Sequence, residues 1–194
     1  MPKYYPIMLD IRERQVFIIG GDRVAAEKAA ALVASGAWVR VLSSEFCAEL
    51  LALAEQTQVT LVHKHYEYGD LVGAFIVVAV SSDEQQIETI WRETQERGQP
   101  VNIVDVPRYC SFILPSILRR GQLTVAVSTE GASPALAKRI RQQLEAFFPH
   151  AYGAYIDLAA LTRTYLRRAG VAYATRDTFF QEFMDSAILT LLSA

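Results

Sequence analysis

Apolar residues follow two patterns along the first half of the chain, short continuous runs and longer segments with helical spacing. The runs are apolar at every position, as in Val16-Phe17-Ile18-Ile19, which is typical of parallel strands buried on both faces. Strands are predicted at residues 15–19, 38–42, 60–63, 75–80 and 101–104, and helices at 23–35, 45–56 and 83–96. This alternation predicts an α/β fold with a Rossmann-like parallel sheet, in which ligands bind beyond the carboxyl ends of the strands.

The pattern changes after the fifth predicted strand. Extended segments are predicted at residues 111–118 and 123–128. Ser133-Pro134 then opens a helical stretch over residues 135–148, because serine is a favoured cap and proline a favoured first helical residue. Residues 151–192 have the spacing of two or three helices with a break near Gly170, so we expect a boundary near residue 149.

The segment after the first strand is a candidate dinucleotide-binding turn. Its candidate contact residues are Gly20, Gly21, Asp22, Arg23 and Val24. A strand, a glycine turn and a helix together present free helix amides to a phosphate. The dinucleotide fingerprint has glycine at its first and third positions, whereas the third position here is Asp22, an anionic side chain where a pyrophosphate would lie. The turn therefore predicts nucleotide binding through an incomplete motif, and a tight turn without a ligand is the alternative.

Polar side chains follow other predicted strands at the same edge of the sheet. Ser43 follows the second strand, where an acidic residue would normally bind a ribose hydroxyl, and Arg40 would favour a 2′-phosphate if it pointed there. The choice between NAD and NADP stays open. Asp105 ends the fifth strand, where a carboxylate can abstract a proton, although an Asx cap on a loop is the alternative.

The segment from Ser128 to Pro134 places small polar residues and glycine directly before a helix, with Lys138, Arg139 and Arg141 in the first turns of that helix. Amides, hydroxyls and cations together suit a carboxylate-rich ligand. The alternative is a capped helix with a solvated face.

Composition narrows the class of protein. Of the 194 residues, 52% are hydrophobic, which excludes a disordered chain. The formal net charge of −2 gives no global field for nucleic acid or a membrane, so any polyanion site must be local. Cys47 and Cys110 are too few for a disulfide framework or a zinc site, and we expect reduced thiols in a cytoplasmic protein. His63 and His65 favour a solvated strand end over a metal pair, and no metal site is predicted.

Four segments in order carry a family resemblance: IIGGDRVAAEKA, SGAWVRVLS, VNIVDVPRYCSFILPSILRRGQLTVAVST and EGASPALAKRIRQQLE. This set resembles the precorrin-2 dehydrogenase and sirohydrochlorin ferrochelatase family of siroheme synthesis, the siroheme synthase N-terminal type. The resemblance covers about residues 4–148 and adds a helical tail of similar length. The family is implied by this resemblance and not by the spacing of the residues alone.

The resemblance implies NAD-dependent oxidation of precorrin-2 to sirohydrochlorin by a homodimer, and some members also insert ferrous iron. It implies a dinucleotide-binding domain at 1–113, a dimerisation and substrate segment at 114–148, and a helical domain at 149–194. Asp105 takes the catalytic position, while Ser81 and Asn102 join Ser43 beside the cofactor. The implied substrate-binding residues are Arg119, Arg120, Ser128, Thr129, Ser133, Lys138 and Arg141.

Three departures from the family pattern fall on turns that would face ligands. Asp22 replaces a glycine, Ser81-Ser82 replaces a pair of aspartates, and Glu130 replaces a glycine. Two of these changes add negative charge. Two rival functions therefore stay open: a tetrapyrrole-binding protein or chelatase that has lost NAD-dependent activity, and a non-enzymatic Rossmann scaffold.

Overall fold

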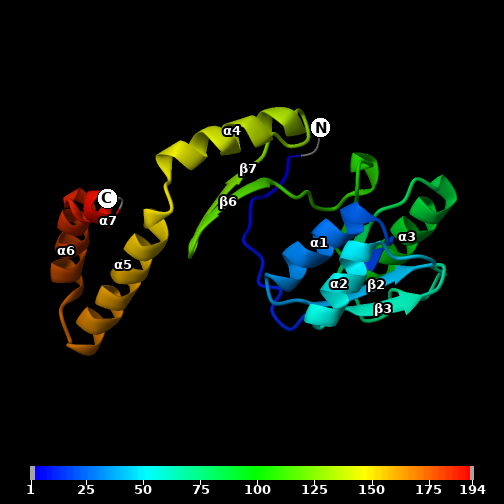
Figure 1. Cartoon of the computed structure of the whole chain (residues 1–194), viewed down its shortest axis with the longest axis horizontal. Coiled ribbons are helices and arrows are strands. Elements are labelled where there is room, and N and C mark those ends of the chain that lie inside the picture. The colour runs from blue at the N-terminus through cyan, green and yellow to red at the C-terminus, as the bar shows by residue number, and fades with distance from the viewer. Residues whose placement is uncertain (1–2, 193–194) are drawn as a thin grey trace. The chain divides into compact units, whose positions relative to one another are not determined.

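A computed structural model describes residues 3–192 (Figure 1). The chain divides into two compact units, Met1–Ile113 and Leu114–Ala194. No helix among the described residues is long and apolar enough to cross a bilayer. The further division predicted between residues 148 and 149 stays a prediction.

The first unit is a five-stranded parallel sheet with helices between its strands. Its strands are β1 (Gln15–Ile19), β2 (Trp38–Ser43), β3 (Thr60–His63), β4 (Ile76–Ala79) and β5 (Val101–Ile103). Its helices are α1 (Arg23–Val33), α2 (Ala48–Gln56) and α3 (Glu84–Arg97), followed by a short 3-10 turn, η1 (Pro107–Tyr109). The strand order is β3-β2-β1-β4-β5, and every pairing is parallel. The predicted Rossmann-like α/β fold is confirmed.

Two apolar layers cover the two faces of this sheet. On one face Val16 and Ile18 of β1 pack in a cluster with the buried alanines of α1 and with Leu50 of α2. On the other face Phe17 and Ile19 of the same strand pack in a cluster with α3. Because successive side chains of a strand point to opposite faces, an apolar run is what a strand between two helical layers requires.

A buried carboxylate fixes the β3–β4 connection onto α3. The side chain of Glu93 is fully buried and accepts hydrogen bonds from the Tyr66 hydroxyl at 2.6 Å, the Gly69 amide at 2.8 Å and the Leu71 amide at 3.2 Å. Arg97 adds an ion pair at 2.8 Å. Burial alone would raise the pKa of Glu93, but these donors outweigh burial and the pKa is lowered.

The second unit is a hairpin followed by helices. Strands β6 (Ser116–Arg120) and β7 (Leu123–Val127) pair antiparallel, and helices α4 (Pro134–Phe147), α5 (Ala151–Arg168), α6 (Tyr173–Asp185) and α7 (Ile188–Leu192) follow. Both α4 and α5 contact the hairpin. The Oγ of Ser133 accepts from the Leu136 amide at 3.3 Å, so the serine cap predicted for α4 is present.

Several predicted boundaries are wrong, among them the following three. The second helix begins at Ala48 instead of residue 45, because the Cys47 amide donates to the Gly21 carbonyl and holds residues 44–47 as a loop. The first helix ends at Val33, two residues early, in a turn closed by Gly36. The extended segment predicted from residue 111 becomes a strand only at Ser116.

Candidate active site

The ends of four neighbouring strands define the candidate site. Ser43 is the last residue of β2, and Gly20, Val80 and Val104 follow β1, β4 and β5, at the carboxyl edge of the sheet. The connections run in opposite directions from β1, toward β2 on one side and β4 on the other. Such a topological switch point opens a crevice where dinucleotides bind in folds of this class.

Gly20 and Gly21 are required by the protein's own close contacts. Gly20 has φ +124°, and a Cβ there would lie 2.7 Å from the Val80 carbonyl oxygen. A Cβ on Gly21 would lie 1.8 Å from the Glu45 carbonyl oxygen and 2.6 Å from the Ser43 hydroxyl oxygen. No side chain fits at either distance, so this turn can pass between the loops after β2 and β4 only as glycine.

Asp22 is the N-cap of α1. Its carboxylate accepts a hydrogen bond from the Ala25 amide at 2.9 Å. Among residues 3–192, no acceptor is bonded to the main-chain amides of Arg23 and Val24. The helix therefore keeps two free amides for a phosphate, as the fingerprint requires, but presents them beside a carboxylate. The turn fits a dinucleotide sterically and opposes it electrostatically.

The hydroxyls predicted beside the cofactor lie at this edge. Ser43 accepts weakly from the Glu45 amide at 3.4 Å and lies next to Gly21. Ser81 accepts from the Asp83 amide at 3.1 Å, at the start of α3. Arg40 takes another direction, with its guanidinium 5.0 Å from the centre of the Phe17 ring.

Asn102 lies inside the β5 region and is 9% exposed. Its amide nitrogen donates to the Phe112 carbonyl at 3.0 Å and approaches the Cys110 sulfur at 3.6 Å. The side chain thus fastens the loop that follows β5.

Asp105 is exposed and lies at the start of that loop, two residues after β5. Its φ of +62° is the left-handed conformation, which a residue other than glycine adopts at a cost and which is frequent at functional sites. The Ser111 hydroxyl accepts from the Val101 amide at 2.7 Å, and the Ser111 amide donates to the Val101 carbonyl at 2.9 Å. The base of the loop is therefore closed, and the carboxylate is held at the edge of the sheet.

Cys110 completes this closure, which sequence reasoning missed. Its sulfur accepts from the Ile103 amide at 3.2 Å and lies 3.1 Å from the Ile103 carbonyl oxygen. Burial raises the pKa of the Cys110 thiol. The sequence offered one signal, the pair Cys110-Ser111 shortly after the fifth predicted strand. In the structure this pair follows a tight turn and lies beside β5.

The predicted substrate-binding residues all belong to the second unit, and most of their polar groups are used within it. Ser128 accepts from the Glu130 amide and Thr129 from the Ser133 amide, each at 3.0 Å. Arg120 donates to the Phe148 carbonyl at 2.8 Å.

The cationic side chains of this set differ in whether they already have a bonding partner. Arg141 forms an ion pair with Glu145. Among the described residues, the side chains of Arg119 and Lys138 have no hydrogen-bond or ion-pair partner. Glu130 has φ +53°, so this carboxylate stands in left-handed backbone where the resemblance expects glycine.

Metal ligands do not gather anywhere in the described part of the chain: no group of three or more His, Cys, Asp and Glu is placed to hold an ion. The His63 ring instead contacts Phe46 edge-on, with ring centres 6.0 Å apart.

Comparison with known proteins places this geometry in a family. The family model described as putative NAD(P)-binding matches residues 7–116, and the model described as sirohaem biosynthesis protein central matches residues 120–146. The siroheme synthase of Mannheimia succiniciproducens is 34% identical over 97% of this chain, and that of Nitrosomonas eutropha is 34% identical over 98%.

The chain spans 40% of the length of each of these two relatives. A solved structure described as SirC, precorrin-2 dehydrogenase, superposes with a TM-score of 0.82 at 25% identity, covering 96% of this chain and 92% of that one. The NAD(P)-binding match alone covers more than half of the chain, and with the sirohaem-specific match beside it the chain belongs to the siroheme biosynthesis family of precorrin-2 dehydrogenases and siroheme synthases.

Proposed function

We propose that this chain oxidises precorrin-2 to sirohydrochlorin with NAD as the electron acceptor, in siroheme biosynthesis. The observation that carries the proposal is Asp105, a carboxylate in left-handed backbone at the carboxyl edge of the sheet, on a loop closed at its base. The solved structure described as a precorrin-2 dehydrogenase supports the substrate, and the match to the NAD(P)-binding family model supports the cofactor.

The reaction removes two electrons and two protons from precorrin-2. NAD, when bound, accepts a hydride, and one proton remains to be taken up, so the products are sirohydrochlorin, reduced NAD and H⁺. Asp105 is the proposed base for that proton, since it is an exposed carboxylate at the edge where the cofactor turn ends. Gly20 and Gly21 shape the cofactor turn, the amides of Arg23 and Val24 would hold the phosphates, and Ser43 and Ser81 would border the cofactor.

Arg119 and Lys138 are the proposed contacts for the carboxylates of the substrate, because their charges are not neutralised within residues 3–192. Arg120 and Arg141 are proposed as weaker contacts, since each is already bonded within the second unit.

Two further proposals concern the state of the protein. We propose a homodimer, supported by apolar side chains that the predicted dimerisation segment, residues 114–148, leaves in solvent, among them Leu136 at 49% and Phe147 at 70% exposure. We propose a cytoplasmic location, supported by two free cysteines, which suit a reducing compartment.

The deciding experiment uses Asp105→Asn and Asp105→Ala. Asparagine tolerates left-handed backbone, so Asp105→Asn removes the base while it keeps the loop conformation. We expect formation of reduced NAD from precorrin-2 to fall by about 10²-fold or more, with NAD affinity unchanged. Undiminished turnover in Asp105→Asn would remove Asp105 from the mechanism.

One observation favours the rival function, a tetrapyrrole-binding protein or ferrochelatase without NAD. Asp22 already places a carboxylate on the helix terminus that would hold a pyrophosphate. This rival expects a porphyrinoid to bind with no reduced NAD formed. Iron insertion is tested in the same variants, because two pyrrole protons must leave as Fe²⁺ enters and Asp105 is the proposed acceptor.

A further inference from the structure

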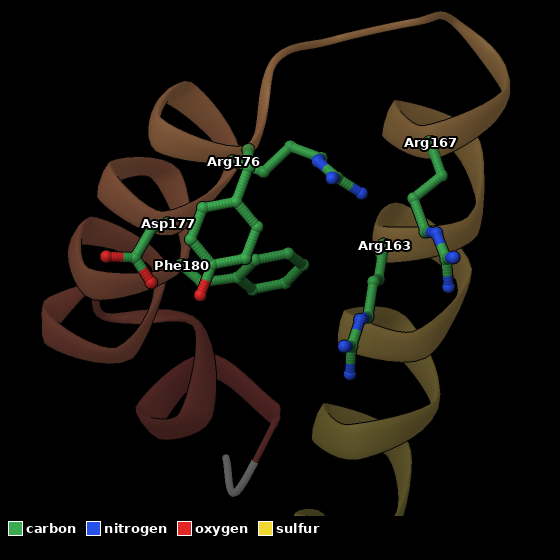
Figure 2. A pocket seen from close by; sticks show the side chains of 6 residues that line it. Arg163, Arg167, Arg176, Asp177 and Phe180 are labelled. Carbon is green, nitrogen blue, oxygen red and sulfur yellow. The ribbon is translucent and has the colours of Figure 1, made fainter.

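A pocket of about 350 Å³ lies between α5 and α6, within the second unit. Its lining residues are Arg163, Arg167, Tyr173, Arg176, Asp177 and Phe180. We call it the arginine pocket. Figure 2 shows Arg163 and Arg167 coming from α5 and Arg176 reaching toward them from α6.

The three guanidinium groups have no counterion. Within residues 3–192, none of them forms an ion pair or donates a side-chain hydrogen bond. The Nε of Arg176 is buried and lacks an acceptor. A buried guanidinium N–H without a partner is costly, and like charges gathered on one cavity repel. The pocket is thus arranged for an acceptor that the described residues do not supply.

The start of α6 adds to this positive potential. Its cap residue, Ala172, has no capping side chain, and the first turn of α6 contains no acidic residue. Arg176 lies in that region, although a helix N-terminus favours negative charge. Arg167 has an ordinary explanation, since it lies in the last turn of α5, where cations are stabilised. Arg176 has none.

The remaining lining restricts the ligand. Tyr173 is 75% exposed, and the Arg176 guanidinium lies 5.9 Å from the centre of its ring. Phe180 supplies a second ring, so the pocket has a flat apolar wall. Asp177 adds one negative charge to the lining, against the three positive charges of the arginines.

We propose that the arginine pocket binds the carboxylates of a flat polycarboxylate ligand of the tetrapyrrole class, with the apolar body of the ligand against Tyr173 and Phe180. Guanidinium groups pair with carboxylates through two parallel hydrogen bonds, and aromatic rings offer a face to a planar macrocycle. The choice of a tetrapyrrole rests on the proposed function, whereas the need for an anion rests on the pocket alone.

The test is a fluorescence titration of the full-length protein with uroporphyrin I, an octacarboxylate, without NAD. Single variants Arg163→Gln, Arg167→Gln and Arg176→Gln are each expected to raise the Kd about tenfold, the loss of one charge-assisted contact. The matched control is Arg168→Gln, which removes the same charge from α5 but lines a different cavity, with Asp157 and Tyr165. The control is expected to change the Kd less than twofold.

Stability gives an independent readout. Because Arg176 lacks a partner, Arg176→Gln is expected to leave the Tm of the ligand-free protein unchanged or raised, and to reduce the rise in Tm that uroporphyrin I causes. A residue with a merely structural role would lower the ligand-free Tm instead.

Three outcomes overturn the proposal. The first is an equal loss of affinity in Arg168→Gln and Arg176→Gln, which indicates diffuse surface charge. The second is no loss in any variant. The third is tighter binding of pyrophosphate than of uroporphyrin I, which assigns the pocket to phosphates. If the wild-type protein forms no reduced NAD from precorrin-2 but still binds uroporphyrin I through these arginines, the proposed function is refuted and the proposal for the pocket stands.

Discussion

The charge of Asp22 should weaken NAD binding, and its removal can be separated from the loss of the helix cap. Asn caps a helix about as well as Asp, so Asp22→Asn should keep the bond to the Ala25 amide while it removes the negative charge. The change in NAD affinity then reports electrostatics alone.

The expected magnitude follows from the position of the side chain. A pyrophosphate held by the amides of Arg23 and Val24 would lie roughly 4 Å from the Asp22 carboxylate, which is exposed and screened by water. Two charges at that distance repel by about 1 kcal/mol in water, which corresponds to roughly a fivefold gain in affinity for Asp22→Asn. Partial exclusion of water by the bound cofactor would enlarge the gain.

Isothermal titration with NAD measures this gain, and two variants serve as controls. Asp22→Ala should gain affinity similarly but lose about 1 kcal/mol of stability, because alanine cannot cap the helix. Glu55→Gln removes one negative charge at the last turn of α2, away from the carboxyl edge of the sheet, and should not alter affinity. Low-micromolar binding by the wild type, unchanged in Asp22→Asn, would refute the repulsion.

Three further predictions concern the framework of the first unit. Glu93→Gln should lower the free energy of unfolding in urea by about 3 kcal/mol, because it breaks a buried, charged hydrogen-bond cluster. Since the pKa of Glu93 is lowered on folding, its stabilisation should persist above about pH 4.5 and fade below, and Glu93→Gln should flatten that acid dependence. Gly21→Ala should cost at least about 3 kcal/mol or prevent folding, since its Cβ would meet the Glu45 carbonyl, and circular dichroism would detect either. In a Cys47→Ser variant, the half-buried Cys110 thiol should react with DTNB at pH 8 more slowly in the folded protein than in urea; equal rates would contradict its partial burial.

The sheet was predictable because its strands are buried on both faces, and a run such as Val16 to Ile19 has no other simple explanation. The site was less predictable, because side-chain partners there come from distant segments. Asp22 has the same sequence signature whether it faces a ligand or caps α1, and only the 2.9 Å bond to Ala25 separates the two. Glu93 gave no signal, since its partners at residues 66–71 are joined to it by the fold.

The second unit was predictable in its elements and not in its chemistry. The serine cap and proline at the start of α4 are local signals, and both are present. In the sequence Arg120 is a plausible ligand-binding cation, yet its guanidinium donates a hydrogen bond to the Phe148 carbonyl. The sequence gives no sign that Arg163, Arg167 and Arg176 line one pocket, because this depends on how α5 and α6 pack.

The two glycines of the turn affect how the loss of a cofactor can be recognised in the sequences of this family. Val80 and Glu45 would exclude any side chain at Gly20 and Gly21 even if no nucleotide ever bound. A descendant that abandoned the cofactor would therefore keep both glycines under selection for folding alone. Asp22 occupies the neighbouring position, where a capping residue stabilises α1 whether or not a phosphate binds. A lost cofactor would thus leave its trace at residue 22, one step beyond the glycines by which such turns are usually recognised.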